Sequence, residues 1–317
     1  MQTPLHIGVD VAKDEVVAAC AENTIAVRAV PNRRAALLAF LQSLPPGSSL
    51  GLEATGIYHE RLADLAVARG FTVFVLNPKD TRHYAQALGR RAKTDRVDAE
   101  CIARFIQHAS ARLHAYTPPT TTQRRIDRLI QRRAKLTIVK GTLQLSFKGL
   151  RGFETDVAEM RQRLDAWIAK IDAMLAALAH ASPTRRNTLK RLQTIVGVGP
   201  LVGISLANTL ERVPFKNADA FVAFTGLDPR LRDSGQKIGR RRLSKRGPGE
   251  LRRLLFNAAM SGARSRVWKP IYQHYRARGM PTTAALVVIA RKIARTAWSV
   301  YHHQTTFDPK RLTQCLT

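Results

Sequence analysis

Apolar and polar positions alternate in two different periods over the first third of the chain. Strand-like patterns cover residues 5–11, 15–20, 24–27, 49–53 and 71–76. Helical spacing covers residues 33–44, 58–69, 78–88 and 96–107. Three strands followed by alternating helices and strands predict an α/β domain over residues 1–115.

A Pro- and Thr-rich segment, residues 117–122, predicts a linker, and long helical patterns follow it. In the first pattern leucines recur every seven residues, at Leu129, Leu136, Leu143 and Leu150. In the second, apolar residues alternate at spacings of three and four, at Val157, Met160, Leu164, Trp167, Ile171, Met174 and Leu178. Such spacing is typical of a coiled-coil seam. It predicts a helical arm over residues 116–183, which either joins subunits or packs on its own domain as a hairpin. A mainly helical domain is expected over residues 184–317.

The charge of the chain narrows the classes of partner. Among 317 residues there are 52 Lys and Arg against 23 Asp and Glu, which gives a formal net charge of +29. Such an excess favours a polyanionic partner, with nucleic acid ahead of an anionic membrane surface. No apolar run approaches the roughly 20 residues of a membrane helix, and the first residues resemble no signal peptide. The cysteines, Cys20, Cys101 and Cys315, fit neither a zinc site nor a disulfide framework. We therefore expect a cytoplasmic protein.

Four carboxylates occupy positions that can meet at one edge of the predicted sheet. Asp10 ends the first strand, Glu53 ends the fourth, and Asp95 and Asp98 share one face at the start of a helix. Clustered carboxylates need a cation, and Mg²⁺ or Mn²⁺ prefers oxygen ligands. Two such ions about 4 Å apart can assist phosphodiester transfer. Alternatively, Asp95 only favours the helix N-terminus behind a Thr94 cap, and the other acids are solvated.

A glycine turn opens the third part of the chain. Residues 195–201 read as a helix, a tight turn containing Gly197 and Gly199, and a second helix. Glycines and free N–H groups at a helix start can approach a phosphate, as in a helix-hairpin-helix element that binds DNA. An ordinary turn between helices remains the alternative.

The most basic stretch of the chain follows. Its cations are Arg230, Arg232, Lys237, Arg240, Arg241, Arg242, Lys245, Arg246, Arg252 and Arg253. An arginine-rich loop is suited to gripping phosphates, although a solvated surface loop would look similar. Two serines within it, Ser234 and Ser244, are candidate nucleophiles if neighbouring groups activate the hydroxyl. Each is otherwise an ordinary turn serine.

These segments together resemble one known family. Residues 8–13, 53–58 and 93–99 are similar to the RuvC-like, ribonuclease-H-type domain of the DEDD transposases. This group of insertion-sequence transposases and recombinases includes Piv-type DNA invertases and bridge-RNA-guided recombinases. Residues 226–229, 233–235, 243–247 and 251–255 resemble the C-terminal domain of the same family.

The resemblance assigns roles to particular residues. It implies that Asp10, Glu53, Asp95 and Asp98 form a metal-binding tetrad and that Ser234 joins covalently to DNA, with Ser244 as its rival. It also implies a dimer or tetramer, a guide noncoding RNA, and the element ends and target as DNA partners. The protein would then be associated with the bacterial nucleoid.

Three other functions stay open. A structure-specific nuclease of the Holliday-junction type would need the carboxylates and metal but no serine. A Piv-type invertase would use the same parts as a transposase. A nucleic-acid binder without enzymatic activity would need none of the carboxylates.

Overall fold

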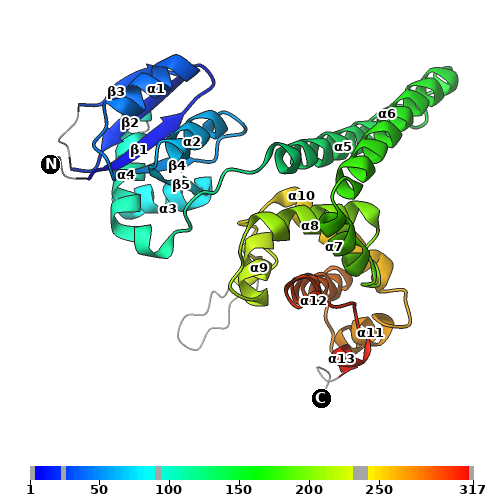
Figure 1. Cartoon of the computed structure of the whole chain (residues 1–317). Helices are drawn as coiled ribbons and strands as arrows, with labels where there is room; N and C mark the ends of the chain where they lie inside the picture. The colour runs from blue at the N-terminus through cyan, green and yellow to red at the C-terminus, as the bar shows by residue number, and fades with distance from the viewer. Residues whose placement is uncertain (1–3, 23–25, 90–93, 231–241, 314–317) are drawn as a thin grey trace. The chain divides into compact units, whose positions relative to one another are not determined.

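The computed structural model describes residues 4–22, 26–89, 94–230 and 242–313. Its internal contacts divide the chain into two compact units, residues 1–118 and 119–317 (Figure 1). The predicted domain boundary near residue 115 stays a prediction. The further separation of a helical arm, residues 116–183, from a C-terminal domain, residues 184–317, stays a prediction.

The first unit is a five-stranded sheet covered by helices. Its strands are β1 (His6–Val11), β2 (Glu15–Cys20), β3 (Arg28–Pro31), β4 (Ser49–Glu53) and β5 (Thr72–Leu76). Its helices are α1 (Arg34–Gln42), α2 (His59–Ala68), α3 (Pro78–Ala87) and α4 (Asp95–Ala109), with a 3-10 turn at Ser110–Arg112. The strand order is β3-β2-β1-β4-β5, in which β1, β4 and β5 run parallel and β2 is antiparallel to both of its neighbours.

Alternation along the strands places two apolar clusters on opposite faces of this sheet. Val9 and Leu52 pack with α1 and α2 on one face. Phe74 and Leu76 pack with Ile102 and Ile106 of α4 on the other. Because every second residue points to one face, Asp10 lies on the α4 side of β1, opposite Val9 and Val11.

A glycine pair brings α4 unusually close to the sheet. Gly8 of β1 and Gly51 of β4 are partners across the parallel ladder. A Cβ at Gly8 would lie 2.1 Å from the carbonyl oxygen of Ala99, and one at Gly51 would lie 2.7 Å from Cγ2 of Ile106. Only residues without a side chain allow the helix to lie directly on both strands.

The second unit is mainly helical. It contains α5 (Thr121–Ser146), α6 (Glu154–His180), α7 (Pro183–Gln193), α8 (Pro200–Arg212), α9 (Ala218–Thr225), α10 (Gly249–Gly262), α11 (Lys269–Ala277), α12 (Thr282–His302) and α13 (Lys310–Thr313). Two short strands, β6 (Pro229–Arg230) and β7 (Arg242–Leu243), form a ribbon. One core joins α12 to α7, α8, α9 and α10, and it also takes in Ile126, Ile130, Leu175 and Ala179 from α5 and α6.

The two long helices α5 and α6 lie side by side as an antiparallel hairpin (Figure 1). A capping box at Thr120 starts α5, so the predicted linker ends earlier than expected, and Thr121 and Thr122 are helical. The ion pairs between α5 and α6 fix the antiparallel register: Arg133–Asp172 at 2.6 Å and Lys140–Asp165 at 2.5 Å.

The predicted seam of α6 is partly wrong. Val157, Leu164, Ile171 and Leu178 do face inward, but Met160 and Trp167 are 49% and 60% exposed. Arg161, Ile168 and Leu175 take the intervening inward positions instead. Alternate residues of the predicted seam therefore do pack inward in the hairpin. Met160 and Trp167 instead belong to a second apolar stripe, which faces solvent.

One strand is displaced from its predicted place. A strand was expected at residues 24–27, whereas β3 spans Arg28–Pro31, and residues 23–25 lie outside the described residues. The cause is its position at the sheet edge, where pairing with β2 sets the strand and most side chains are exposed. An edge strand of this kind gives no apolar alternation to recognise.

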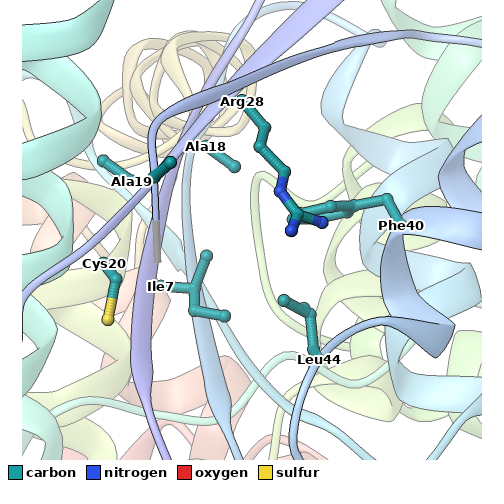
Figure 2. Close-up of a pocket in the computed structure, with 8 residues that line it drawn as sticks. Ile7, Ala18, Ala19, Cys20, Arg28, Phe40 and Leu44 are labelled. Carbon is teal, nitrogen blue, oxygen red and sulfur yellow. The ribbon is translucent and has the colours of Figure 1, made fainter. Parts of the chain in front are cut away.

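Two further features bear on function. No helix in the described segments is both long enough and apolar enough to cross a membrane. A cavity of about 10 Å³ lies under β1 and β2 against α1, lined by apolar side chains that include Ile7, Phe40 and Leu44 (Figure 2). Its volume is near that of a single water molecule, so it is a packing defect and no substrate site.

Candidate active site

The carboxyl ends of the parallel strands bring Asp10 and Glu53 together. The ladder pairs Val9 of β1 with Leu52 of β4, so the next residues along both strands are these two acids. Helix α4 begins beside them at Asp95, behind a Thr94 side chain that accepts a hydrogen bond from the Val97 N–H at 3.3 Å.

The pKa of Asp10 reports this convergence. The pKa rises from 3.8 to about 6, first through burial and then through the carboxylates of Asp95, Asp98 and Glu53, in that order. Since like charges disfavour ionisation only at short range, the other three predicted acids all lie close enough to Asp10 to act on it. Thr94 also caps the helix, as the alternative interpretation expects.

The donor chemistry of this cluster fits a hard divalent cation. All four ligands would be carboxylate oxygens, and a cation would relieve the repulsion that raises the pKa of Asp10. Within the ranges that the structure describes, however, no three acidic, histidine or cysteine side chains lie near enough to one another to hold an ion. The carboxylates share an electrostatic environment without forming a closed coordination shell.

Two polar side chains support the acids, and neither was predicted. The Thr81 hydroxyl of α3 donates a hydrogen bond of 2.7 Å to Oε2 of Glu53. The buried Asn32 amide donates to the carbonyl oxygens of Ala12, at 3.0 Å, and Tyr58, at 3.3 Å. Asn32 thereby ties the loop after Asp10 to the loop after Glu53. All three hydrogen bonds join residues far apart in sequence, so no local pattern could have indicated them.

In the second unit, the predicted glycine turn lies between α7 and α8. Gly197 has φ +97°, and a Cβ there would lie 2.4 Å from the Ala258 carbonyl oxygen of α10. Packing against α10 therefore accounts for this glycine. Gly199 precedes α8 in open space, and no side chain caps that helix start. Gly199 remains the better of the two candidates for a phosphate contact.

The structure places only part of the basic stretch. Arg230 of β6 and Arg242 of β7 are paired across the ribbon and exposed. Lys245 and Arg246 follow the ribbon and are also exposed. The other predicted members, together with the candidate nucleophile, lie outside the described residues: Arg232, Ser234, Lys237, Arg240 and Arg241.

Two arginines of this stretch have structural partners. Arg252 donates to the carbonyl oxygens of Thr225, at 3.1 Å, and Gly247, at 3.3 Å, and burial lowers its pKa. Arg253 makes a bidentate pair with Glu250, and these hydrogen bonds raise its pKa. Both guanidiniums are thus engaged within the fold.

The rival serine is enclosed. Ser244 is 4% exposed, its hydroxyl donates to Oδ1 of Asp228, and its N–H donates to the Asp228 carbonyl oxygen at 2.9 Å. These contacts join the residue after β7 to the residue before β6, at one end of the ribbon. A hydroxyl in this position has no open path to a DNA phosphate.

Two family models match the chain. Residues 7–150 match a DEDD-type model described as "Transposase", and residues 189–276 match the model "Transposase IS116/IS110/IS902 family". The first match contains all four carboxylates, and the second contains both candidate serines.

Curated relatives cover most of the chain at modest identity. A "Pilin gene-inverting protein" of Moraxella bovis is 26% identical over 82% of this chain and 81% of its own length. A "Probable family 20 transposase" of Pseudomonas aeruginosa is 26% identical over 87% of this chain and 90% of its own. A "Transposase for insertion sequence element IS1328" of Yersinia enterocolitica is 26% identical over 95% and 98%.

Proposed function

The chain belongs to the IS116/IS110/IS902 transposase family and is a DNA recombinase or transposase, and we propose that it moves its own element through a covalent serine–DNA intermediate. In this proposal the carboxylates of the first unit bind Mg²⁺ or Mn²⁺, and Ser234 of the second unit attacks the DNA.

One observation carries the proposal: burial, together with three carboxylates from β4 and α4, raises the pKa of a fourth carboxyl group, on β1, to about 6. Such a cluster is unfavourable in a protein that only binds nucleic acid, since it opposes a polyanion. It is useful where a divalent cation must be held beside a phosphate, and DEDD-type transposase domains use divalent metal ions.

The chain's own groups supply the remaining chemistry. The Ser234 oxygen would form a bond to phosphorus while the bond from phosphorus to one deoxyribose oxygen breaks. The serine proton leaves to solvent or a neighbouring base, and the released deoxyribose oxygen takes up a proton. Attack by a hydroxyl of the rejoining strand then reverses the step and frees the serine. A bound divalent cation would stabilise charge on the phosphate oxygens.

Two observations favour Ser234 over Ser244. Ser234 matches the serine-glycine motif of the family, at Asp233–Gly235. Ser244 is buried and hydrogen-bonded to Asp228. Arg230, Arg242, Lys245 and Arg246 lie on either side of the undescribed residues and are suited to gripping the phosphates beside the nucleophile.

The partners follow from charge and from an uncovered apolar surface. Transposases and invertases bind DNA, and the net charge of +29 suits both DNA and a guide noncoding RNA. Apolar side chains stay exposed on the α5–α6 hairpin: Ile138, Val139, Leu145, Met160 and Trp167. We propose that a second copy of the chain covers this stripe, giving a dimer or tetramer.

Two alternatives keep specific support. The gene-inverting relative favours a DNA invertase that uses the same residues. The carboxylate cluster alone would serve a Holliday-junction nuclease.

A recombination assay in cells separates these functions. A plasmid carrying the element with its noncoding flanks and a target is introduced with each variant, and new DNA junctions are sequenced. We expect no junctions from Asp10→Asn or Ser234→Ala. Junctions formed by inversion alone would assign the invertase. Unimpaired DNA cutting by Ser234→Ala would instead assign the nuclease, and retained activity in Asp10→Asn would exclude the metal-dependent mechanism.

A second experiment tests the guide. The protein is purified gently from cells that carry the whole element, and copurifying RNA is sequenced. RNA from the noncoding flank is expected, and its absence would count against RNA guidance.

A further inference from the structure

A separate cavity lies within the second unit. It has a volume of about 450 Å³ and lies where α7, the end of α8 and the end of α12 meet. Its lining is mixed in character, with Asn187 and Arg191 from α7, Glu211 from α8, and Tyr301 and His302 from α12. It is large enough for a ligand of the size of a nucleotide base.

Glu211, which lines this cavity, has one carboxylate oxygen without a hydrogen-bond partner among the described residues. Arg185 donates from both Nε, at 2.9 Å, and Nη2, at 2.8 Å, to the same oxygen, Oε2. The second oxygen, Oε1, is screened from solvent and has no hydrogen-bond partner within the described residues. An unsatisfied buried oxygen of this kind is rare in folded proteins, and it needs an explanation.

The neighbouring groups indicate what this oxygen would accept. The Tyr301 hydroxyl is close enough that burial and then the Glu211 carboxylate raise its pKa. The His302 ring stacks on Trp298, with centroids 4.6 Å apart and planes inclined by 10°. His302 is itself exposed, so this stack forms a flat aromatic platform beside the carboxylate. Flat platforms of this kind receive unpaired bases in single-stranded nucleic acids.

Charge around the cavity fits the backbone of such a strand. Lys190 is exposed and Arg191 half-buried on α7. A phosphate is a poor occupant of the cavity itself, because the unpaired carboxylate oxygen would repel it. The base therefore belongs inside and the phosphates outside, near these cations.

We propose that this cavity binds an unpaired nucleobase whose exocyclic amino group donates to Oε1 of Glu211. Cytosine meets this requirement through its N4 amino group, which carboxylates accept in nucleic-acid complexes. The proposal rests on the proposed function in one respect, that the chain binds nucleic acid. Because Oε1 is screened, the base reaches it after side chains at the cavity wall rotate, which exposed side chains do in nanoseconds or less.

Oligomers of deoxycytidine and deoxyuridine isolate this interaction. Both are pyrimidines with the same backbone, and their bases differ only in the amino or carbonyl group at position 4 and the adjacent ring nitrogen. Affinities of the full chain for fluorescent 12-nucleotide oligomers of each are measured by anisotropy. A hydrogen bond to a carboxylate predicts roughly tenfold tighter binding of oligo-deoxycytidine.

Glu211→Gln inverts the acceptor without removing the side chain. Arg185 can only donate, so it holds the amide oxygen of the glutamine in the place of Oε2 and leaves the NH₂ group in the place of Oε1. The preference should then disappear or turn toward deoxyuridine, whose O4 accepts. Glu159→Gln on exposed α6 removes the same charge and should leave the preference unchanged. Thermal unfolding confirms that each variant is folded.

The possible outcomes are distinct. Equal affinity of the wild type for both oligomers, or an unchanged preference in Glu211→Gln, overturns the inference and leaves the proposed function standing. No binding of either oligomer contradicts the nucleic-acid function itself. The wild-type comparison decides the inference even if the Glu211 variant fails to fold.

Discussion

Replacing Asp10 by asparagine should stabilise the first unit while it abolishes recombination. The side chain keeps its size but loses a charge that three other carboxylates oppose. The rest of the fold holds the charge of Asp10 in an unfavourable environment, so removing that charge should stabilise the fold.

The magnitude follows from the pKa. A rise from 3.8 to about 6 corresponds to about 3 kcal/mol at full weight. Because Asp10 is only partly buried, solvent screening reduces this to about 1–2 kcal/mol. The stability conferred by the protonated acid is fully present below pH 3.8 and is lost as the pH rises through about 6. The advantage of Asp10→Asn should therefore be about 1–2 kcal/mol at pH 8 and vanish near pH 4.

Hydrogen exchange of β1 and β4 peptides, followed by mass spectrometry in chelator-containing buffer, reports the first unit of the full chain. The three tryptophans, Trp167, Trp268 and Trp298, all belong to the second unit, so their fluorescence during urea unfolding is an internal control that should not change. Asp14→Asn, which removes an exposed acid nearby, serves as the matched variant.

Equal or lower stability of Asp10→Asn at pH 8 would refute the reasoning, because burial and the neighbouring carboxylates would then not oppose the charge of Asp10. Added Mg²⁺ should slow exchange in the wild type and leave Asp10→Asn nearly unchanged. An equal response of both proteins would contradict the assignment of Asp10 as a ligand.

Three further predictions test other parts of the structure. Thr81→Val removes the hydrogen bond to Glu53, so recombination should fall by roughly 10- to 100-fold with little change in thermal stability. Full recombination activity would show that Glu53 does not need this hydrogen bond. Gly8→Ala would place a Cβ against the α4 backbone and should unfold the first unit, whereas Gly141→Ala, with open space around it in α5, should stabilise the second unit by up to about 1 kcal/mol. Urea unfolding measures both variants. Unchanged stability of Gly8→Ala would refute the close approach of α4 to the sheet. Trp167→Glu alters an exposed residue, so the helical circular dichroism should not change, but the mass of the assembly measured by light scattering should fall. An unchanged mass would exclude the apolar stripe of the α5–α6 hairpin as the subunit interface.

The first unit was largely predictable because its strands and helices carry strong periodic patterns. β2 and β4 were predicted with the residue ranges that they have, and β1, β5 and the helices differ by only a residue or two at their ends. The four acids could be brought together from sequence because strand ends and a helix start are local features. The displaced β3 carries no such pattern, since an exposed edge strand is defined by its pairing with β2.

Long-range contacts account for what the sequence did not reveal. The pairing of Gly8 with Gly51 depends on strand register, and the Thr81–Glu53 hydrogen bond depends on how α3 packs. The seam of α6 differs from the predicted one for a similar reason. Arg161 occupies an inward position, and a pattern based on apolar residues does not include an arginine. No sequence pattern indicated Glu211, because a buried carboxylate oxygen without a hydrogen-bond partner can be recognised only in the folded structure.

The most direct test of the central claim is a search for protein covalently joined to DNA. The chain is expressed with its native element and flanks, the cells are lysed under denaturing conditions, and DNA-linked protein is isolated and mapped by mass spectrometry. The account predicts an adduct in the wild type and in Ser244→Thr, and none in Ser234→Ala or Asp10→Asn. DNA cutting that depends on Asp10 without an adduct in any sample would contradict the serine mechanism and assign a nuclease that uses metal alone.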